Sequence, residues 1–287
     1  MSNTLNAVLQ QYENSQKKDF KPKMTDEERK KRYLSTAIED GKSTGQLKIR
    51  ILPNPNGGSP FQEVYYHSIQ VDNKWRKLYD PERNEGKPSP LNDVARALRA
   101  TGGDREKELA KKYQSRKFYI CRVIDRNNEA DGVKFWRFGH NWKQGGVFDK
   151  LAPIFNAKGD ITDIENGYDL IVSLGRDDKG YAKVNSIFPD DRSPLSADPE
   201  QAQAWVNDPM TSDDVYSKPE FGALEIIAKY GESPYFDKET KTYIRKSEWE
   251  AKRAGVQVER ANNAQATANN QDDQADVFLG GNDDLPF

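Results

Sequence analysis

Residues 45–53, GQLKIRILP, alternate apolar and polar side chains along the run Leu47, Lys48, Ile49, Arg50 and Ile51. A period of two is typical of a β-strand with one buried face. The loop that follows, residues 53–60, is rich in Pro, Gly and Asn and ends this strand. The sequence therefore predicts that the folded part of the chain begins with a strand.

Three pairs of β-rich runs follow, and each pair encloses a polar turn. They occupy residues 61–79, with a turn at Asp72-Asn73, residues 117–139, and residues 168–188, with a turn at 177–180. Three hairpins with helical insertions are typical of a small closed barrel. We expect a mainly β fold with helical insertions: an OB-fold-like barrel, flanking helices and a disordered acidic C-terminal tail.

Helical periodicity appears between and after these hairpins. The predicted helices are residues 25–34, 91–100, 105–113, 142–155, 199–206 and 219–230, and the first begins with a Thr-x-x-Glu capping box at Thr25. Residues 3–14 carry a further apolar stripe, Leu5, Val8, Leu9 and Tyr12, which suggests a docking helix. The expected organisation is an N-terminal arm (1–41), an OB-type core (42–198), a helical extension packed on it (199–260) and a disordered linker with an acidic tip (261–287).

Charge is distributed unevenly along the chain, although the formal net charge is only −2. Residues 42–150 contain 22 Lys and Arg against 13 Asp and Glu, whereas residues 151–260 contain 14 against 21 and residues 261–287 none against 5. A basic segment joined to an acidic one suggests a polyanion site and a segment that can compete for it. Solvated charge on both halves is the plain alternative.

Composition excludes several classes of protein. The hydrophobic fraction of 35% and the mean hydropathy of −0.97 indicate a globular part with solvated arms. One cysteine, Cys121, cannot form an internal disulfide, and one cysteine with two histidines cannot build an ordinary zinc site. Residues 1–18 lack the apolar core of a signal peptide, and no apolar run approaches membrane-spanning length. We therefore expect a protein that is not exported and binds no membrane.

Aromatic and cationic residues stand side by side in the expected strands. Unpaired bases need flat apolar surfaces, worth about 1–3 kcal/mol each, and phosphates need Lys or Arg. Because alternate residues share a strand face, one aromatic of each pair can enter the core while its neighbour lies outward among charges. For any single residue, a plain core or solvated role stays open. The predicted single-stranded DNA contacts are Tyr65, Trp75, Arg76, Lys77, Tyr79, Lys112, Arg116, Lys117, Tyr119, Arg122, Lys134, Trp136, Arg137, Trp142 and Lys143.

The last residues, NDDLPF, combine two carboxylates with an apolar pair and a terminal Phe. A basic-rimmed hydrophobic pocket can hold such a peptide by its ring and its carboxylates. Residues 261–276 before it form a polar, low-complexity tract that cannot bury surface. The predicted partner-binding residues are Asp283, Asp284, Leu285, Pro286 and Phe287.

NDDLPF resembles the C-terminal tip of bacterial single-stranded DNA-binding proteins, which recruits replication and repair enzymes. The core resembles the helix-destabilising single-stranded DNA-binding protein of T-even bacteriophages in GQLKIRILPNPNGGSPF (45–61), YYHSIQVDNKW (65–75), RKFYICRVI (116–124) and KFWRFG (134–139). This likeness covers residues 45–230 in patches. It implies a non-enzymatic protein that coats and protects single-stranded DNA in phage replication, recombination and repair, in the cytoplasm of an infected bacterium. It also implies DNA contacts for Arg116, Lys117, Tyr119, Trp136 and Arg137.

The chain departs from that family at its zinc site. His67 stands where the family has a zinc-binding histidine, but the cysteine partners are missing, and residues 88–103 occupy the stretch that should supply them. We expect no metal and no other cofactor, with apolar packing of Leu91, Val94, Ala95 and Leu98 in place of metal ligation. The family's basic-Ser-Thr arm motif, which drives self-association on DNA, is similar to Lys30-Lys31-Arg32-Tyr33-Leu34-Ser35-Thr36 but is interrupted here.

Other functions stay open at this point. The pairs Asp177-Asp178 and Asp190-Asp191 could hold Mg²⁺ in a nuclease, although paired acids in turns are more often turn formers. A recombination mediator or interaction hub could use the tip as its main site, with nucleic-acid binding secondary. RNA binding is a further alternative, because stacking and phosphate contacts do not recognise the 2′-OH.

Overall fold

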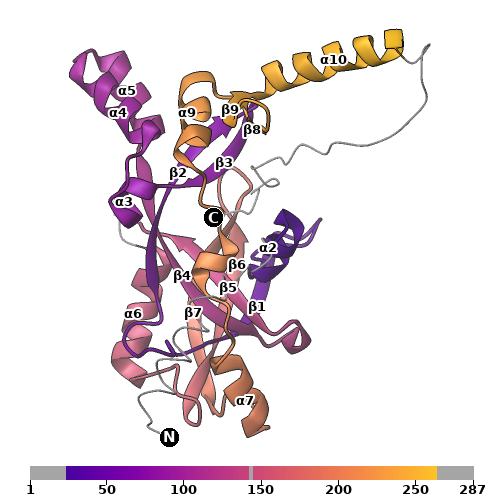
Figure 1. The fold of residues 1–287 in the computed structure, drawn as a ribbon. Coiled ribbons are helices and arrows are strands. Elements are labelled where there is room, and N and C mark those ends of the chain that lie inside the picture. Colours follow the sequence, from indigo (N-terminus) through magenta and orange to yellow (C-terminus); the bar gives the residue numbers. More distant parts are fainter. Residues whose placement is uncertain (1–23, 142–144, 264–287) are drawn as a thin grey trace, which may run out of the picture.

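The computed structural model describes residues 24–141 and 145–263. Its main element is an antiparallel sheet of seven strands in the order β3-β2-β4-β1-β6-β7, with β5 paired to β4 (Figure 1). The mainly β character is confirmed. The strands are β1 (Thr44–Ile51), β2 (Gln62–Val71), β3 (Lys74–Tyr79), β4 (Ser115–Asp125), β5 (Val133–Gly139), β6 (Gly167–Arg176) and β7 (Ala182–Ser193).

All three predicted hairpins are confirmed as β2–β3, β4–β5 and β6–β7. The sheet, however, is not closed into a barrel. One edge of β4 is shared by β2, along Ser115–Ile120, and β1, along Val123–Asp125, while its other edge pairs with β5. Among the described strands, β3 and β7 each pair with one neighbour only and leave the two ends of the sheet apart. The expected closed barrel is therefore not found.

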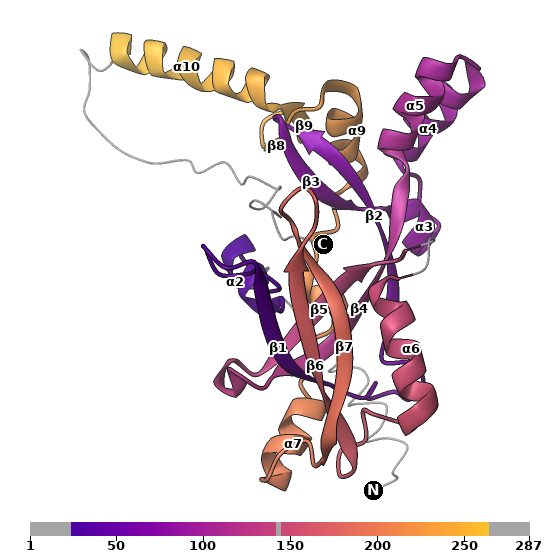
Figure 2. The same cartoon turned by 180° about the vertical axis from the view of Figure 1, so that it is seen from behind.

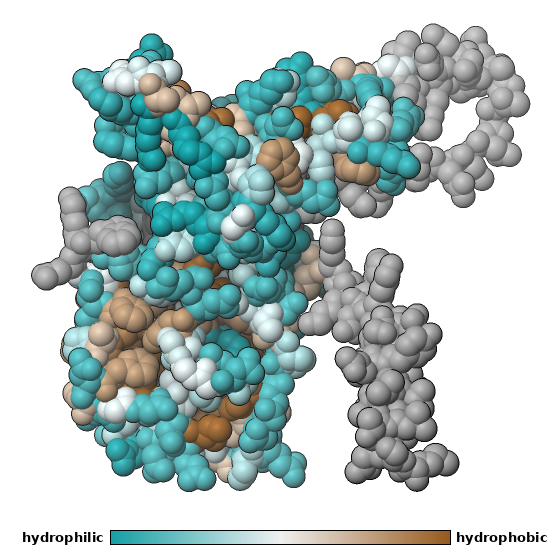
Figure 3. Space-filling model, turned by 60° about the vertical axis from the view of Figure 1, so that its left-hand side comes forward, coloured by the Kyte–Doolittle hydropathy of each residue, from teal (hydrophilic) through white to brown (hydrophobic). Residues whose placement is uncertain are grey.

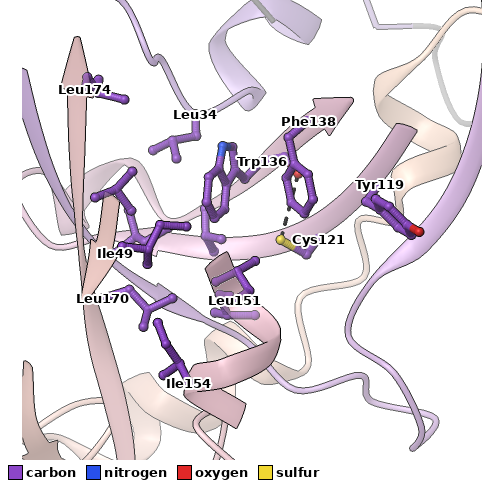
Figure 4. Close-up of a cluster of buried hydrophobic side chains, with 14 of the residues drawn as sticks. Leu34, Ile49, Tyr119, Cys121, Trp136, Phe138, Leu151, Ile154, Leu170 and Leu174 are labelled. Atoms are coloured by element: carbon purple, nitrogen blue, oxygen red, sulfur yellow. Dashed lines mark hydrogen bonds between the residues drawn. The ribbon is translucent and has the colours of Figure 1, made fainter. Parts of the chain in front are cut away.

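The main core lies where β1, β4, β5 and β6 meet helix α6 (Val147–Lys158). Figure 4 shows Trp136, Phe138 and Cys121 from the β4–β5 hairpin turned toward Leu151 and Ile154 of α6. In Figure 2, α6 lies beside β7 at the back of the molecule. The strand alternation of β1 buries Ile49 and Ile51, as their spacing predicts.

Within the described residues there are eight further α-helices besides α6, together with the short 3₁₀ turn η1 (Glu129–Asp131); seven of them come before the β8–β9 hairpin and are described first. Five match predicted helices, and α3 and α8 are short additions that the sequence pattern did not indicate. Their bounds are α2 (Asp26–Arg32), α3 (Pro81–Glu85), α4 (Pro90–Ala100), α5 (Asp104–Tyr113), α7 (Pro199–Val206), α8 (Ser212–Val215) and α9 (Phe221–Tyr230). The Thr25 capping box of α2 is present, with Glu28 as its partner.

The far end of the β2–β3 hairpin leaves the main core and forms an upper lobe with α4, α5 and α9 (Figure 1). Leu91 of α4 and Leu224 of α9 pack there against Val71. Of the four residues expected to pack here, Leu91 and Ala95 are buried, whereas Val94 and Leu98 are half-buried. The hairpin turn is held by Asp72, whose carboxylate accepts hydrogen bonds from the backbone N and the hydroxyl of Ser233.

After α9 the chain forms a small hairpin, β8 (Pro234–Asp237) with β9 (Thr242–Arg245), and then helix α10 (Lys246–Asn263). Neither feature was predicted. Trp249 of α10 stacks on Tyr235 of β8, with ring centroids 4.5 Å apart. No helix in the described part of the chain is long and apolar enough to cross a membrane.

Residues 207–220, called here the crossing segment, run over the front of the sheet from α7 to α9 (Figure 1). Tyr216 and Val215 of this segment pack with Tyr66, Phe118 and other residues of β2 and β4. Figure 1 shows α2 beside it, and Leu34 after α2 donates a hydrogen bond to the carbonyl of Phe135 in β5. The stretch of the predicted arm around Tyr33, Leu34 and Ile38 is thus buried in the fold.

Candidate nucleic-acid interface

Strand register places cations from three strands on one face of the sheet. Tyr66 of β2 lies opposite both Tyr79 of β3 and Arg116 of β4, and Ile120 of β4 lies opposite Arg137 of β5. Directly opposite residues share a face, and so do alternate residues of one strand. We call this surface the basic face. Its residues are Trp75, Lys77 and Tyr79 of β3, Tyr66 of β2, Arg116 of β4 and Arg137 of β5.

Two cations of the basic face, Arg137 and Lys77, contact aromatic rings. The guanidinium of Arg137 lies 4.8 Å from the ring centroid of Tyr33 and 5.2 Å from that of Tyr66. Lys77 Nζ lies 5.5 Å from the ring centroid of Phe118. Cation–π contacts of this kind help to hold a cation in place beside the ring. Arg116 is exposed and belongs to no ion pair among the described residues.

The crossing segment adds a cation that the sequence analysis missed. Lys218 Nζ lies 5.2 Å from the ring centroid of Tyr79 and 5.7 Å from that of Tyr216, and these two rings stack with centroids 5.1 Å apart. Lys218 also forms ion pairs with Glu85 at 2.9 Å and Asp213 at 3.1 Å. Burial lowers the pKa of Lys218, but these hydrogen bonds outweigh it and the pKa is raised. The sequence signal was the aromatic-x-cation run Tyr216-Ser217-Lys218.

Trp75 is the most exposed tryptophan among the described residues, with 57% of its surface accessible. It stands two positions beyond Asn73, in the hairpin turn that Ser233 anchors through Asp72. An exposed indole on a strand next to an anchored turn offers a flat apolar surface on which an unpaired base can stack. Among the predicted aromatic contacts, Trp75 has the geometry that stacking requires.

Three of the predicted aromatic contacts have rings that lie in the interior, which does not favour stacking on a base. Trp136 is 1% exposed, Tyr79 is 4% exposed and Tyr119 is 8% exposed. Figure 4 shows the Trp136 ring among Leu34, Ile49 and Phe138. Trp136 and Tyr119 point away from the basic face, because they alternate with Arg137 and Phe118. A buried ring has no face to offer a base.

Three predicted cations have structural partners instead. Arg122 donates to the carbonyls of Pro53, Val206 and Asp208, which ties α7 to β4, and burial lowers its pKa. Lys117 forms an ion pair with Glu63 at 2.8 Å, and this hydrogen bond raises the pKa of Lys117. Lys134 donates to the carbonyl of Lys31 and pairs with Asp131 at 2.9 Å. These contacts favour a structural role for all three cations.

The remaining predicted contacts are spread over other surfaces. The ring of Tyr65 is half-buried under the guanidinium of Arg83 at 4.3 Å, and Lys112 is exposed on α5. Arg76 lies on the face of β3 opposite to Trp75 and Lys77. Trp142, Lys143, the 3–14 stripe and the five residues of the tip lie outside the described residues.

His67 is fully buried in a polar network of the upper lobe. Its Nδ1 lies 2.7 Å from the carbonyl oxygen of Tyr113, and its Nε2 lies 3.6 Å from a carboxylate oxygen of Asp80. A carbonyl only accepts, so Nδ1 carries the proton. Burial alone would raise the pKa of Asp80, but contacts with His67, Ser115 and Asn92 hold it well below its ordinary value. In the described ranges, no group of three or more His, Cys, Asp and Glu side chains could hold a metal ion.

The paired acids that suggested a nuclease have local structural roles. The carboxylate of Asp177 accepts hydrogen bonds from the backbone of Lys179 and Tyr181 and so shapes the β6–β7 turn. Asp190 forms an ion pair with Lys48 at 2.7 Å. These contacts are typical of turn formers and solvated acids rather than of a shared metal site.

A separate apolar cluster joins α6 to Tyr119 of β4 and to Phe61, which directly precedes β2. Phe148 stacks on Tyr119 with ring centroids 4.7 Å apart, and Phe61 makes edge contacts with Phe148 and Phe155. Figure 3 shows hydrophobic side chains gathered on the lower half of the face seen there, whereas hydrophilic side chains cover most of the upper half. This cluster lies apart from the cations of the basic face and was not predicted.

No protein-family model matches this chain, and no curated protein sequence matches it. The functional assignment therefore depends on the geometry of the basic face and on the residues that the sequence places there.

Proposed function

We propose that this protein binds single-stranded DNA along the basic face, and that it coats and protects the strand during phage DNA replication, recombination and repair. The observation that carries the proposal is the convergence of Lys77, Arg116 and Arg137 from three strands, with the exposed ring of Trp75 at one end. Cations supply phosphate contacts and the ring supplies a stacking surface, the combination that unpaired nucleotides require.

Two features favour single strands over duplex. Phosphate contacts alone would serve either form, but the indole of Trp75 can stack only on a base that is not already stacked between neighbours. The sharing of β4 between β1, β2 and β5 is compatible with a partly open OB-type barrel, which is a common platform for single strands. The OB assignment and the likeness to the T-even phage protein belong to this proposal.

The direct test is the binding of fluorescein-labelled oligo-dT, oligo-U and duplex DNA, followed by anisotropy at two salt concentrations. We expect tighter binding of oligo-dT than of duplex, with an affinity that falls steeply with salt as counterions are released. Equal affinity for oligo-dT and duplex DNA would contradict the proposal. Tighter binding of oligo-U than of oligo-dT would show that the ligand is RNA.

Charge reversal locates the site. The double variant Lys77→Glu, Arg116→Glu should weaken oligo-dT binding by about 100-fold or more, because two phosphate contacts become repulsive. The matched control is Lys183→Glu, an exposed lysine on β7 at the opposite end of the sheet. If the double variant bound oligo-dT as tightly as wild type does, the basic face would not be the binding site.

Recruitment of replication proteins through residues 283–287 is the second part of the proposal. It rests on the sequence NDDLPF alone. A peptide with this sequence should bind a basic, hydrophobic partner pocket, and replacing its final Phe by Ala should abolish capture.

A further inference from the structure

The crossing segment lies directly on part of the basic face. Its residues Val215 and Tyr216 are buried there and pack with Tyr66 and Phe118 of the sheet. Figure 1 shows the segment running over the front of the sheet on its way from α7 to α9. A strand of DNA that follows the basic face must therefore pass around this segment or displace it.

Tyr216 occupies a surface that a base could use. Its ring stacks on the ring of Tyr79, with centroids 5.1 Å apart and planes at 14°, and meets the ring of Tyr66 edge-on at 5.9 Å. Parallel stacking on a flat ring is also the contact that an unpaired base makes with an aromatic side chain. Since Trp75, Lys77 and Tyr79 alternate along one face of β3, removal of Tyr216 would add a second ring to the row that begins with the exposed Trp75.

The same segment carries an acid that takes up a cation of the site. The carboxylate of Asp213 accepts a hydrogen bond from Lys218 at 3.1 Å, and Lys218 is also paired with Glu85 at 2.9 Å. Asp213 accepts a further hydrogen bond from the hydroxyl of Tyr216. Together, Asp213 and Tyr216 make the ionic contact and the stacking contact that a nucleotide makes with a protein.

Side-chain contacts help to hold this segment on the sheet. The hydroxyl of Tyr33 donates to the carbonyl of Val215 at 3.0 Å, and the hydroxyl of Ser212 donates to the side-chain oxygen of Gln62. Each of these contacts is a single hydrogen bond, whereas the strands beneath are joined by ladders of backbone hydrogen bonds. A segment held in this way opens at a lower cost in free energy than a paired strand does.

We propose that residues 210–216 act as an autoinhibitory strap, in which Tyr216 and Asp213 cover Tyr79 and engage Lys218 until a bound single strand displaces them. The inference rests on the proposed function and extends it, because it adds a base-stacking subsite on Tyr79 that is covered in the closed form. A ligand shifts such an equilibrium only through its higher affinity for the open form. The apparent affinity is then the intrinsic affinity multiplied by the fraction of molecules that are open.

The first test is Tyr216→Ala, which uncovers the ring of Tyr79 and leaves the cations of the basic face in place. Oligo-dT should bind about tenfold more tightly, because a larger fraction of the molecules is open. Weaker binding would show that Tyr216 itself contacts DNA. Unchanged affinity with a lower Tm would show that it only supports the fold, and either result would overturn the inference.

A second variant leaves the core intact. Asp213→Asn replaces a half-exposed acid, frees Lys218 from one partner and should tighten oligo-dT binding up to about fivefold at low salt. The matched control is Asp191→Asn, which removes the same charge from an exposed position on β7, at the opposite end of the sheet. Equal gains in the two variants would indicate a general effect of net charge and would count against the strap.

Hydrogen exchange of the backbone amides measures the displacement directly. In wild type, oligo-dT should speed exchange at residues 210–216, because the strap leaves the sheet when the strand binds. Slower or unchanged exchange there, with oligo-dT bound, would mean that the segment stays in place, and the inference would be wrong although the basic face binds DNA. Failure of the wild type itself to bind oligo-dT would instead refute the proposed function.

Discussion

In the proposed binding mode, Trp75 is the residue that stacks on a base. Its replacement by Ala should weaken oligo-dT binding by about 1–3 kcal/mol, the value of one base–aromatic stack, while the salt slope stays unchanged because no phosphate contact is lost. Quenching of intrinsic tryptophan fluorescence and anisotropy would measure both quantities.

Two variants serve as controls for this prediction. Trp75→Phe should keep most of the affinity, since a flat ring remains. Trp136→Ala should instead lower the free energy of unfolding by about 3–5 kcal/mol, because it opens a cavity in the core. A loss of DNA affinity in folded Trp136→Ala equal to that in Trp75→Ala would contradict the assignment of the exposed ring.

Asp80 gives the upper lobe a pH dependence. Its pKa is lowered in the folded protein, so its carboxylate stabilises the fold fully above its unfolded pKa of about 3.9 and loses that contribution as pH falls through the folded value. Asp80→Asn should therefore cost about 3–5 kcal/mol at pH 7, by breaking a buried charged network, and less below pH 3.

Urea unfolding of wild type and Asp80→Asn at pH 7 and near pH 3 would measure this difference. Asp93→Asn, an exposed acid of α4, is the control and should change stability by less than about 1 kcal/mol at either pH. A difference between wild type and Asp80→Asn that grows as the pH falls would contradict the lowered pKa.

Among the elements, the β2–β3 hairpin is expected to affect both the stability of the protein and its binding of oligo-dT. Asp72 and Asn73 both have positive φ, 50° and 63°, as a two-residue turn of the primed type requires. A β-branched residue is strained in this region, so Asn73→Val should destabilise the protein by roughly 1–2 kcal/mol. It should also weaken oligo-dT binding, because Trp75 follows two positions later.

Glycine provides the control for the turn. Asn73→Gly accepts positive φ without strain and should keep both stability and affinity close to wild type. Urea unfolding and oligo-dT titration of both variants would check the prediction. Equal stability of the Val and Gly variants would show that this turn tolerates strain.

The crossing segment shows how an element can serve the basic face from a distance in sequence. Tyr33 donates a hydrogen bond to the carbonyl of Val215 at 3.0 Å, and its ring lies under Arg137. Tyr33, the residue after α2, therefore links Val215 of the crossing segment to Arg137 of β5. Any change that loosens this segment would shift Lys218 and Arg137 together.

At the scale of the whole molecule, the uneven distribution of charge predicts competition between the acidic end and DNA. Deleting residues 277–287 should leave oligo-dT affinity unchanged or tighten it up to about fivefold at low salt, since exposed charge interactions are worth about 0–1 kcal/mol. The gain should vanish as the salt concentration rises.

The same deletion separates a DNA binder from an interaction hub. A binder keeps its DNA affinity and loses only capture of replication proteins, whereas a hub loses its main activity. Replacing Asp283 and Asp284 by Asn is the matched variant, because it removes charge while keeping chain length. Loss of oligo-dT binding on deletion would contradict the competition model.

Local patterns were sufficient for much of the architecture. Alternation in GQLKIRILP, the Asp72-Asn73 turn and the capping box at Thr25 each depend on residues close in sequence, so the three hairpins and most helices could be predicted. The local clustering of cations with aromatic residues also indicated which strands carry the basic face.

Only the tertiary structure decided which side chains are available on that face. Alternation says that neighbours such as Trp136 and Arg137 point to opposite sides, but not that α6 packs on one side and that the crossing segment packs on part of the other. Arg50 is buried because Asp169, far away in sequence, reaches it at 2.8 Å, and Lys218 joins the basic face through the crossing segment. Burial and ion pairing depend on contacts between distant segments, and these form only when the chain packs.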